Sequence, residues 1–599
     1  MKRAIFIIIL LATTKCLSQI YFSPNASMYV KDEVIFVNQY VNLDSNSNFY
    51  LRNNAQLVQG STGSSSNTGI GKLSVYQEGN SDNFDYNYWC SPVGLPALSV
   101  GNGNFGITLL NQPTSAIASS PAVALASIID DGFSNPLSIA TRWIYKLSSD
   151  QGYSGWNFVG DANSIITGEG FTMKGTSGTD LIDPEGNGIP NNSGSAQRYD
   201  FRGKPNDGTI TLNIDANSVL LTGNPYPSAL HLNAFLLDAD NNLTGGVAYF
   251  WEQDRTADSH YLEDYRGGYG AYSPVNLASN GVYVPATFDS YNSDGSLNMV
   301  GLSSGLIIER KYTPIGQGFI VTSLTTGTVK FKNSHRSYYK EYGSLSQFQK
   351  QVKAISKTSK SSSSLQESTE VSHIKINAII NNQVTRQLAL VFSPEATDGI
   401  DFGIDAPNYN LKVPNDVHFY IGNENYVIEG INFDVAKSVP LIITADAPAS
   451  FNFYIPEVVN FDTNQQIYLY DAVEKSYHNI KNGNYQLNLD AGVYQDRFKI
   501  TFDDQATLGT ENSISQGLVI IQDNKNNNLV VHNPQEADLQ LLKIYDLSGK
   551  AVLAKKSLGT ATHYSLSTST LNSGMYMVKI TSVDNNTSTQ KIIISRFNN

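Results

Sequence analysis

Cysteine, long hydrophobic runs and clustered positive charge are all scarce in this chain. The 599 residues contain two cysteines, Cys16 and Cys90, which excludes a scaffold held by disulfides. Charged residues make up 16% of the sequence, and the net charge is −13. Because nucleic acid requires clustered Lys and Arg to neutralise its phosphates, we exclude it as a partner.

The one long apolar run lies at the N-terminus. Met1-Lys-Arg precedes Ala4–Ala12 (AIFIIILLA), which is followed by small residues ending at Ser18. This order is typical of a secretory signal peptide, and we expect cleavage after Ser18. Lys15 before Cys16 does not favour lipidation. No later run reaches the ~20 apolar residues of a membrane-spanning helix, so we predict no transmembrane segment in the mature chain.

Aromatic and turn-forming residues are abundant instead. The chain has 34 Tyr, 26 Phe and 47 Gly, and segments such as Val34–Val37 and Phe451–Ile455 are short, rich in branched or aromatic residues, and bounded by Gly, Asn, Asp or Ser. This pattern favours strands over helices. We therefore predict a multidomain all-β protein built from β-sandwich or jelly-roll-like modules.

Changes in composition divide the chain into successive parts. Residues 354–370 are rich in Ser, Lys and Glu without hydrophobic periodicity, as expected of a flexible tether. Seven short strand patterns between 371 and 503 indicate a β-sandwich. The predicted parts are a signal peptide (1–18), a short solenoid-like or capping β segment (19–85), two β-rich units (86–215 and 216–345), a linker (346–370), the sandwich (371–503), a second linker (504–515) and a C-terminal domain (516–599).

The two β-rich units share landmarks in the same order. Each has a Ser-Pro or Asn-Pro turn, an aromatic strand with Trp, and a Gly-x-Gly-Phe motif, at Gly168–Phe171 and Gly316–Phe319. Such spacing suits an internal duplication, although the abundance of Gly and aromatic residues could also produce it by chance. We expect the glycines to allow close backbone approach and the Phe rings to be buried.

Three segments near the C-terminus form a distinctive series: Leu542–Val552 (LKIYDLSGKAV), Leu571–Ile580 (LNSGMYMVKI) and Thr589–Ser595 (TQKIIIS). Together they resemble the C-terminal sorting domain, of type A, that directs proteins of Bacteroidota to the type IX secretion system. The matching positions are Tyr545, Asp546, Gly549, Lys550, Gly574, Tyr576 and Lys591.

The resemblance implies an immunoglobulin-like β-sandwich and a destination outside the cell. Proteins with this domain are exported first by the Sec pathway and then by the type IX translocon, whose C-terminal signal peptidase or sortase commonly removes the domain. Many are then anchored to surface lipopolysaccharide. We therefore expect an extracellular or cell-surface location. The rest of the chain resembles uncharacterised β-rich surface proteins with the same domain.

No catalytic motif is supported by its context. Gly301–Gly305 matches G-x-S-x-G, but a strand pattern follows it where a nucleophile elbow needs a helix. Gly101–Gly106 matches G-x-G-x-x-G without a surrounding βαβ unit, so we interpret it as a turn. We therefore predict no catalytic residues and no cofactor, and we expect the protein not to be an enzyme.

Two weaker patterns suggest binding. Asp398, Asp401 and Asp405 lie in a Gly-containing stretch, where carboxylates either hold Ca²⁺ or cap their own turns. A Gly-rich stretch also carries four tyrosines able to anchor a glycan or a protein, unless they are ordinary strand residues: Tyr261, Tyr265, Tyr269 and Tyr272.

These observations predict a non-catalytic adhesin or a glycan- or matrix-binding factor. The alternative is a secreted polysaccharide-active enzyme, or an accessory subunit of one, since its β modules would look alike. Such an enzyme would need two carboxylates facing an open cleft. The ligand itself is not specified by any motif.

Overall fold

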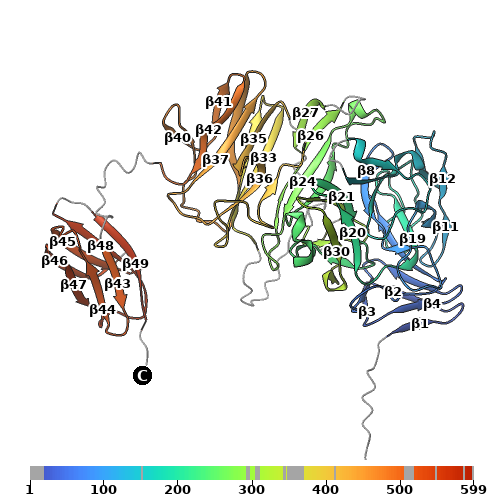
Figure 1. The fold of residues 1–599 in the computed structure, drawn as a ribbon, viewed down its shortest axis with the longest axis horizontal. Helices are drawn as coiled ribbons and strands as arrows, with labels where there is room; N and C mark the ends of the chain where they lie inside the picture. The colour runs from blue at the N-terminus through green and yellow to red at the C-terminus, as the bar shows by residue number, and fades with distance from the viewer. Residues whose placement is uncertain are drawn as a thin grey trace, which may run out of the picture. The chain divides into compact units, whose positions relative to one another are not determined.

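The computed structural model describes residues 19–149, 153–291, 297–303, 310–341, 346, 348, 370–410, 413–504, 518–546, 550–583 and 587–595. The predicted signal peptide, most of both linkers and Gly549 lie outside these residues. Strands account for 51% and helices for 5% of the structure, which confirms the multidomain all-β class (Figure 1). The chain divides into two compact units, one ending at Thr501 and one beginning at Phe502.

The first described residues form a coil of short strands, in which each strand pairs in parallel with a strand of the next coil. Ile20 pairs with Val41, Val34 with Gln56 and Asn48 with Lys72, so one turn is roughly twice the ten-residue step suggested by the sequence. The strands are β1 (Ile20–Phe22), β2 (Ser27–Lys31), β3 (Val34–Val37), β4 (Val41–Leu43), β5 (Asn48–Arg52), β6 (Gln56–Gln59) and β7 (Lys72–Glu78).

Asparagine and aspartate form the corners of this stack. Asn25 and Asn46 both have left-handed backbone conformations, as do Asp32 and Asn53 in the next corner. These residue types tolerate that conformation best among those with side chains. The stacked corners are joined by hydrogen bonds, from Asn46 Nδ2 to Asn25 Oδ1 at 3.3 Å and from Asn53 Nδ2 to Asp32 Oδ1 at 2.5 Å.

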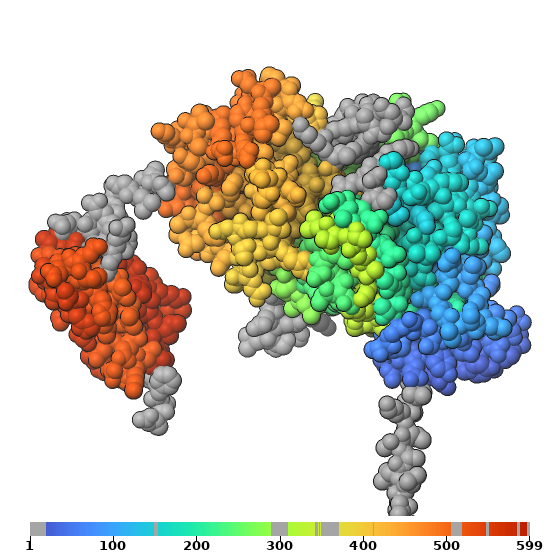
Figure 2. All heavy atoms as spheres, viewed as in Figure 1, coloured from blue at the N-terminus to red at the C-terminus, as the bar shows by residue number. Residues whose placement is uncertain are grey.

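The solenoid-like stack shares its core with the residues that follow it. β7 pairs with β19 (Arg198–Pro205), and one apolar cluster contains Phe22, Leu73 and Phe201. The predicted parts 19–85 and 86–215 therefore form one packed body, and the space-filling view shows them as contiguous (Figure 2). The other strands here are β8 (Tyr86–Cys90), β9 (Val93–Gly94), β10 (Leu110–Pro113), β11 (Ser119–Pro121), β12 (Val123–Leu125), β13 (Gly132–Ser134), β14 (Leu137–Ala140), β17 (Gly170–Lys174) and β18 (Thr176–Ser177).

A sheet of nine strands follows, in the order β16-β15-β21-β29-β23-β24-β26-β27 with β25 beside β24. A second apolar cluster, which includes Tyr226, Phe235 and Phe319, packs around the short helix α1 (Leu232–Leu236). The strands are β15 (Tyr145–Ser149), β16 (Trp156–Phe158), β20 (Ile210–Ile214), β21 (Ser218–Gly223), β22 (Ala229–His231), β23 (Ala248–Gln253), β24 (Gly267–Ser273), β25 (Val282–Val284), β26 (Thr287–Tyr291), β27 (Leu297–Ser303), β28 (Tyr312–Thr313), β29 (Gly318–Ser323), β30 (Gly327–Phe331) and β31 (Arg336–Ser337).

Both Gly-x-Gly-Phe motifs adopt the same arrangement. Gly168 and Gly316 have positive φ angles of 92° and 79°, and both Phe171 and Phe319 are fully buried. In each half, the residue directly before the Pro-containing turn pairs with the second glycine: Cys90 with Gly170, and Gly223 with Gly318. The predicted roles of the Gly and Phe residues are confirmed, while the duplication itself stays a prediction.

Residues 373–501 form one sheet of eleven strands, in the order β40-β39-β42-β37-β35-β36-β33-β32-β38-β41 with β34 beside β36. Strand β32, which lies between β33 and β38 in this sheet, is buried along nearly its whole length. The strands are β32 (His373–Ile380), β33 (Val384–Phe392), β34 (Ala406–Pro407), β35 (Asn415–Ile421), β36 (Glu424–Ile431), β37 (Ser438–Ala445), β38 (Ala449–Val459), β39 (Tyr468–Asp471), β40 (Ser476–Asn479), β41 (Tyr485–Leu489) and β42 (Gly492–Thr501).

The C-terminal unit is a small two-sheet domain with its own apolar core. One sheet has the order β43-β44-β47 and the other β46-β45-β48-β49. The strands are β43 (Val519–Asp523), β44 (Asn528–His532), β45 (Leu539–Tyr545), β46 (Ala551–Gly559), β47 (His563–Ser567), β48 (Gly574–Ser582) and β49 (Thr587–Ile594).

Candidate functional site

The predicted sorting residues lie at the ends and faces of three adjacent strands. Tyr545 ends β45, and the next residue, Asp546, is joined to Lys550: the Asp546 amide donates to the Lys550 carbonyl at 3.0 Å, and the Lys550 amide donates to Asp546 Oδ1 at 3.1 Å. Gly574 begins β48, where the buried Tyr576 donates its hydroxyl to the Asn572 carbonyl at 3.0 Å. Lys591 lies on β49 opposite Met577.

The four candidate tyrosines do not form one surface. Only Tyr261 is prominently exposed, at 73%, whereas Tyr265 and Tyr272 are buried. Tyr272 donates to Asn233 Oδ1, and Tyr269 lies 2.9 Å from the Tyr88 hydroxyl. The alternative that these are ordinary structural residues therefore describes them better than a shared binding patch.

The three candidate calcium ligands are engaged by local partners. Asp398 pairs with Lys437, and the Asp401 carboxylate accepts hydrogen bonds from the backbone and hydroxyl of Thr397. Asp405 accepts from the backbone of Asp401 and Gly430. Within the described ranges, no group of three or more His, Cys, Asp or Glu side chains could hold a metal ion. The three carboxylates therefore stabilise the conformation of the loop that contains them.

Lys174 stands at the centre of a buried polar and aromatic cluster. Its Nζ lies 4.0 Å from the centre of the Trp143 ring, 3.0 Å from His260 Nδ1, and in contact with the Tyr265 hydroxyl. His260 Nε2 in turn lies 2.9 Å from Asp131 Oδ1. If Lys174 donates to Nδ1, the Nε2 proton is directed at Asp131.

Burial changes the charge state of this cluster. It lowers the pKa of Lys174 to about 7, against the opposing effect of Asp85, and raises the pKa of Asp85 itself to about 7. A lysine of low pKa can act as a nucleophile, but Lys174 is only 3% exposed. The cluster therefore connects β17 to the segment around His260 and Tyr265 rather than presenting a reactive amine to a substrate.

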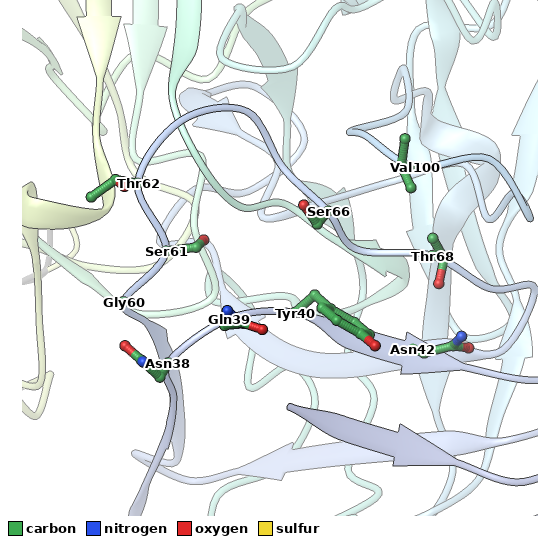
Figure 3. Close-up of a pocket in the computed structure, with 10 residues that line it drawn as sticks. All are labelled: Asn38, Gln39, Tyr40, Asn42, Gly60, Ser61, Thr62, Ser66, Thr68 and Val100. Atoms are coloured by element: carbon green, nitrogen blue, oxygen red, sulfur yellow. The ribbon is translucent and has the colours of Figure 1, made fainter. Parts of the chain in front are cut away.

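An open pocket lies at the end of the solenoid-like stack, with a volume of about 700 Å³. Figure 3 shows Tyr40 along one side of it, with Ser66 and Thr68 across from the ring. The lining carries amides, hydroxyls and one aromatic ring, and no charged group. It comprises Asn38, Gln39, Tyr40, Asn42, Gly60, Ser61, Thr62, Ser66, Thr68 and Val100.

Two buried polar residues hold the loops that line this pocket. Asn67 accepts from the Val41 amide at 2.8 Å and donates to Gln59 Oε1 at 3.0 Å, which ties the loop after β6 to the strands beneath. Asp207 accepts from Ser61 Oγ at 3.1 Å and exchanges hydrogen bonds with Asn102, which lies next to the Val100 loop.

Arg336 holds Asp207 in place. Its Nη1 lies 3.2 Å from Asp207 Oδ1, and both side chains are fully buried. A charge-assisted bond in such surroundings fixes the carboxylate firmly. The pocket is therefore formed before any ligand binds.

Neither the pocket nor the Lys174 cluster could be predicted from the sequence. Their residues come from separate segments and carry no motif. Stacked Asn and Asp corners were the one available signal, because their recurrence in the first sixty residues marks the solenoid that carries the pocket.

Comparison with known proteins identifies both parts of the chain. Residues 5–502 match a family described as "Domain of unknown function (DUF8693)", and the chain belongs to that family. Residues 523–595 match the secretion system C-terminal sorting domain. No curated protein matches the chain.

Two solved structures show only distant similarity. The central fibronectin-III array of RIM-binding protein is 9% identical, covering 38% of this chain and 88% of that one, with a TM-score of 0.12. The extracellular domain of a putative one-component system from B. thetaiotaomicron is 12% identical, covering 65% and 62%, with a TM-score of 0.11. Scores this low carry no argument about the fold.

The sorting domain defines the class of this protein. It is an all-β protein exported by the type IX secretion system, with which the domain interacts, and its location is the cell surface or the extracellular space. This confirms the predicted resemblance and address. Among the described residues, no helix is long and apolar enough to span a membrane.

Proposed function

We propose that the protein is a non-catalytic surface adhesin that binds neutral glycans in the pocket between Tyr40 and Ser66. The observation that carries this proposal is the uncharged, hydrogen-bonding lining of the pocket. Asn and Gln side chains offer both donors and acceptors, as Ser and Thr hydroxyls do. Sugar hydroxyls have the same dual character, and the Tyr40 ring offers a face for the apolar side of a pyranose.

The size and rigidity of the pocket support the same ligand class. Its volume of about 700 Å³ falls within the usual range of ligand sites, ~300–1,000 Å³. Most such sites are mainly apolar, so a pocket lined by amides and hydroxyls suits a ligand that is itself polar. Anchoring by Asp207 and Asn67 reduces the entropy lost on binding.

The absence of charge from the lining favours binding over hydrolysis. Glycoside hydrolysis needs a pair of carboxyl groups beside the substrate, and none of the ten lining residues is acidic. The described carboxyl groups with raised pKa values, among them Asp85 and Asp405 at about 7 and Glu429 at about 9, do not line the pocket.

A glycan array with residues 19–502 tests the proposal. We expect binding to neutral saccharides, and Tyr40→Ala to weaken it at least ~10-fold, which corresponds to about 1.4 kcal/mol. Tyr29→Ala is the matched control, because Tyr29 is an exposed tyrosine of β2 that does not line the pocket. Uniform lack of binding, or equal losses in both variants, would count against the pocket.

A further inference from the structure

The sorting domain has one sheet face that is rich in lysine. On β45, Leu542 and Ile544 point into the core, so Lys543 and Tyr545 point outward. The same alternation places Lys579 of β48 and Lys591 of β49 on the outer face. None of the four strands β46, β45, β48 and β49, which are adjacent in the sheet, contains an Asp or Glu (Figure 1).

Two of these lysines are direct cross-strand neighbours. Lys543 and Lys579 are paired in the register of β45 and β48, and they are flanked by Ala554 and Thr589 on the outer strands. Like charges in this position destabilise a sheet. No acidic side chain of the described residues forms an ion pair with Lys543, Lys579 or Lys591. The face therefore has an uncompensated positive charge that the isolated fold does not need.

Apolar side chains continue the same face beyond the lysines. Met577 lies between Tyr545 and Lys591 in the register, and it is 37% exposed. Ile593, which follows Lys591 by two residues on β49 and lies on the same face, is 60% exposed. An apolar centre beside charged side chains is typical of a surface that binds another protein.

We propose that this lysine face, defined by Lys543, Lys579, Lys591, Tyr545 and Met577, docks on an acidic protein surface of the type IX secretion machinery. The interaction of the domain with that machinery is established by its family, whereas the face and its chemistry follow from the structure. An acidic partner would compensate the Lys543–Lys579 repulsion and would guide the domain by long-range attraction.

Charge reversal in the full-length chain tests the proposal in a bacterium with a type IX system. We expect Lys543→Glu with Lys579→Glu to reduce the surface-exposed fraction at least ~10-fold, as the loss of favourable charge pairs at an interface predicts. The matched control is Lys525→Glu with Lys555→Glu. It makes the same change in net charge, at positions outside the defined face.

A second variant separates recognition from folding. Lys543→Gln with Lys579→Gln removes the repulsion between the two strands, so the domain should be at least as stable to heat while export still falls. Export of all variants at the level of the unchanged chain would overturn the proposal. A photoreactive residue at Thr589 identifies the partner: adducts mapped to an acidic segment of the machinery support it, and adducts with lipopolysaccharide alone contradict it.

Discussion

The large N-terminal unit and the sorting domain differ in where their charged side chains lie and whether they form ion pairs. The large unit pairs its buried charges internally, as in Arg336 with Asp207 and Arg386 with Asp416, whose side chains are almost completely buried. No ion pair joins two described residues of the sorting domain, and its buried polar residues, Asn533, Thr568 and Ser582, are uncharged. Its lysines face outward.

This difference separates charges that maintain a fold from charges that are available to a partner. Buried pairs contribute to specificity of folding and become costly when one partner is removed. Unpaired surface lysines contribute little to stability and much to recognition. Of the four predictions below, three test that division and one tests the packing of the large unit, from the largest expected effect to the smallest.

The largest loss is expected when a buried pair is broken. Arg386 donates two hydrogen bonds to Asp416, at 2.7 and 2.8 Å. Burial would raise the pKa of Asp416, but Arg386 and His418 outweigh it and hold the pKa well below its usual range. Arg386→Leu removes the main partner of the buried carboxylate and leaves it with His418 and the backbone amide of Val417, so we expect the free energy of unfolding to fall by about 3 kcal/mol. Urea unfolding measures this, and an unchanged midpoint would show that the pair is dispensable.

A smaller loss is expected from steric crowding at the repeated motif. A Cβ on Gly318 would lie 2.6 Å from the carbonyl carbon of Tyr88 and 2.8 Å from the amide nitrogen of Trp89. Gly318→Ala should therefore lower the free energy of unfolding by about 2–3 kcal/mol. Gly399→Ala is the control, because the nearest atom there is 3.6 Å away. Equal stability of the two variants in urea would contradict the close approach.

One buried carboxyl of the large unit breaks the rule of internal pairing. Glu429 Oε2 has no hydrogen-bond partner, and burial, with help from Asp405, raises the pKa of Glu429 to about 9. The folded state therefore takes up a proton, and stability is lost as pH rises from about 4.5 towards 9.

Removing that carboxyl should be stabilising at alkaline pH. We expect Glu429→Gln to raise the free energy of unfolding by about 2 kcal/mol at pH 8 and to change it little at pH 4.5. Unfolding midpoints at the two pH values provide the measurement. The same pH dependence in both proteins would mean that Glu429 is ionised in the fold.

The smallest effect is expected on the sorting domain. Lys543→Gln should leave the thermal midpoint of that domain unchanged or raise its stability by no more than ~0.5 kcal/mol, because it removes a like-charge neighbour. Calorimetry of the full chain measures the thermal midpoint of the sorting domain in both proteins. A loss of stability as large as that expected for Arg386→Leu would contradict the account, because it would show that Lys543 maintains the fold of the sorting domain.

Features with a local pattern could be predicted from the sequence. The segment Phe451–Ile455, whose pattern predicts a strand, lies within β38, where Phe451 and Phe453 are buried. The sorting domain could be recognised because each of its three characteristic segments is continuous in the sequence. The roles of the glycines in the Gly-x-Gly-Phe motifs could be predicted, because glycine alone supplies positive φ and close backbone approach without strain.

Features assembled from distant segments could not be predicted. Asp207 and Arg336 are 129 residues apart in the sequence, and nothing local connects them. The pocket combines residues from the Asn38–Asn42 turn, the Gly60–Thr68 loop and Val100. The four candidate tyrosines are close together in the sequence, yet strand alternation and packing direct them to different surroundings.

The most direct test of the account is the location of a chain that ends at Phe502. We predict that the full-length protein reaches the cell surface or the medium, and that the chain ending at Phe502 accumulates in the periplasm, as measured by protease accessibility of intact cells. Normal surface exposure of the shortened chain would contradict the assignment of export to the C-terminal domain.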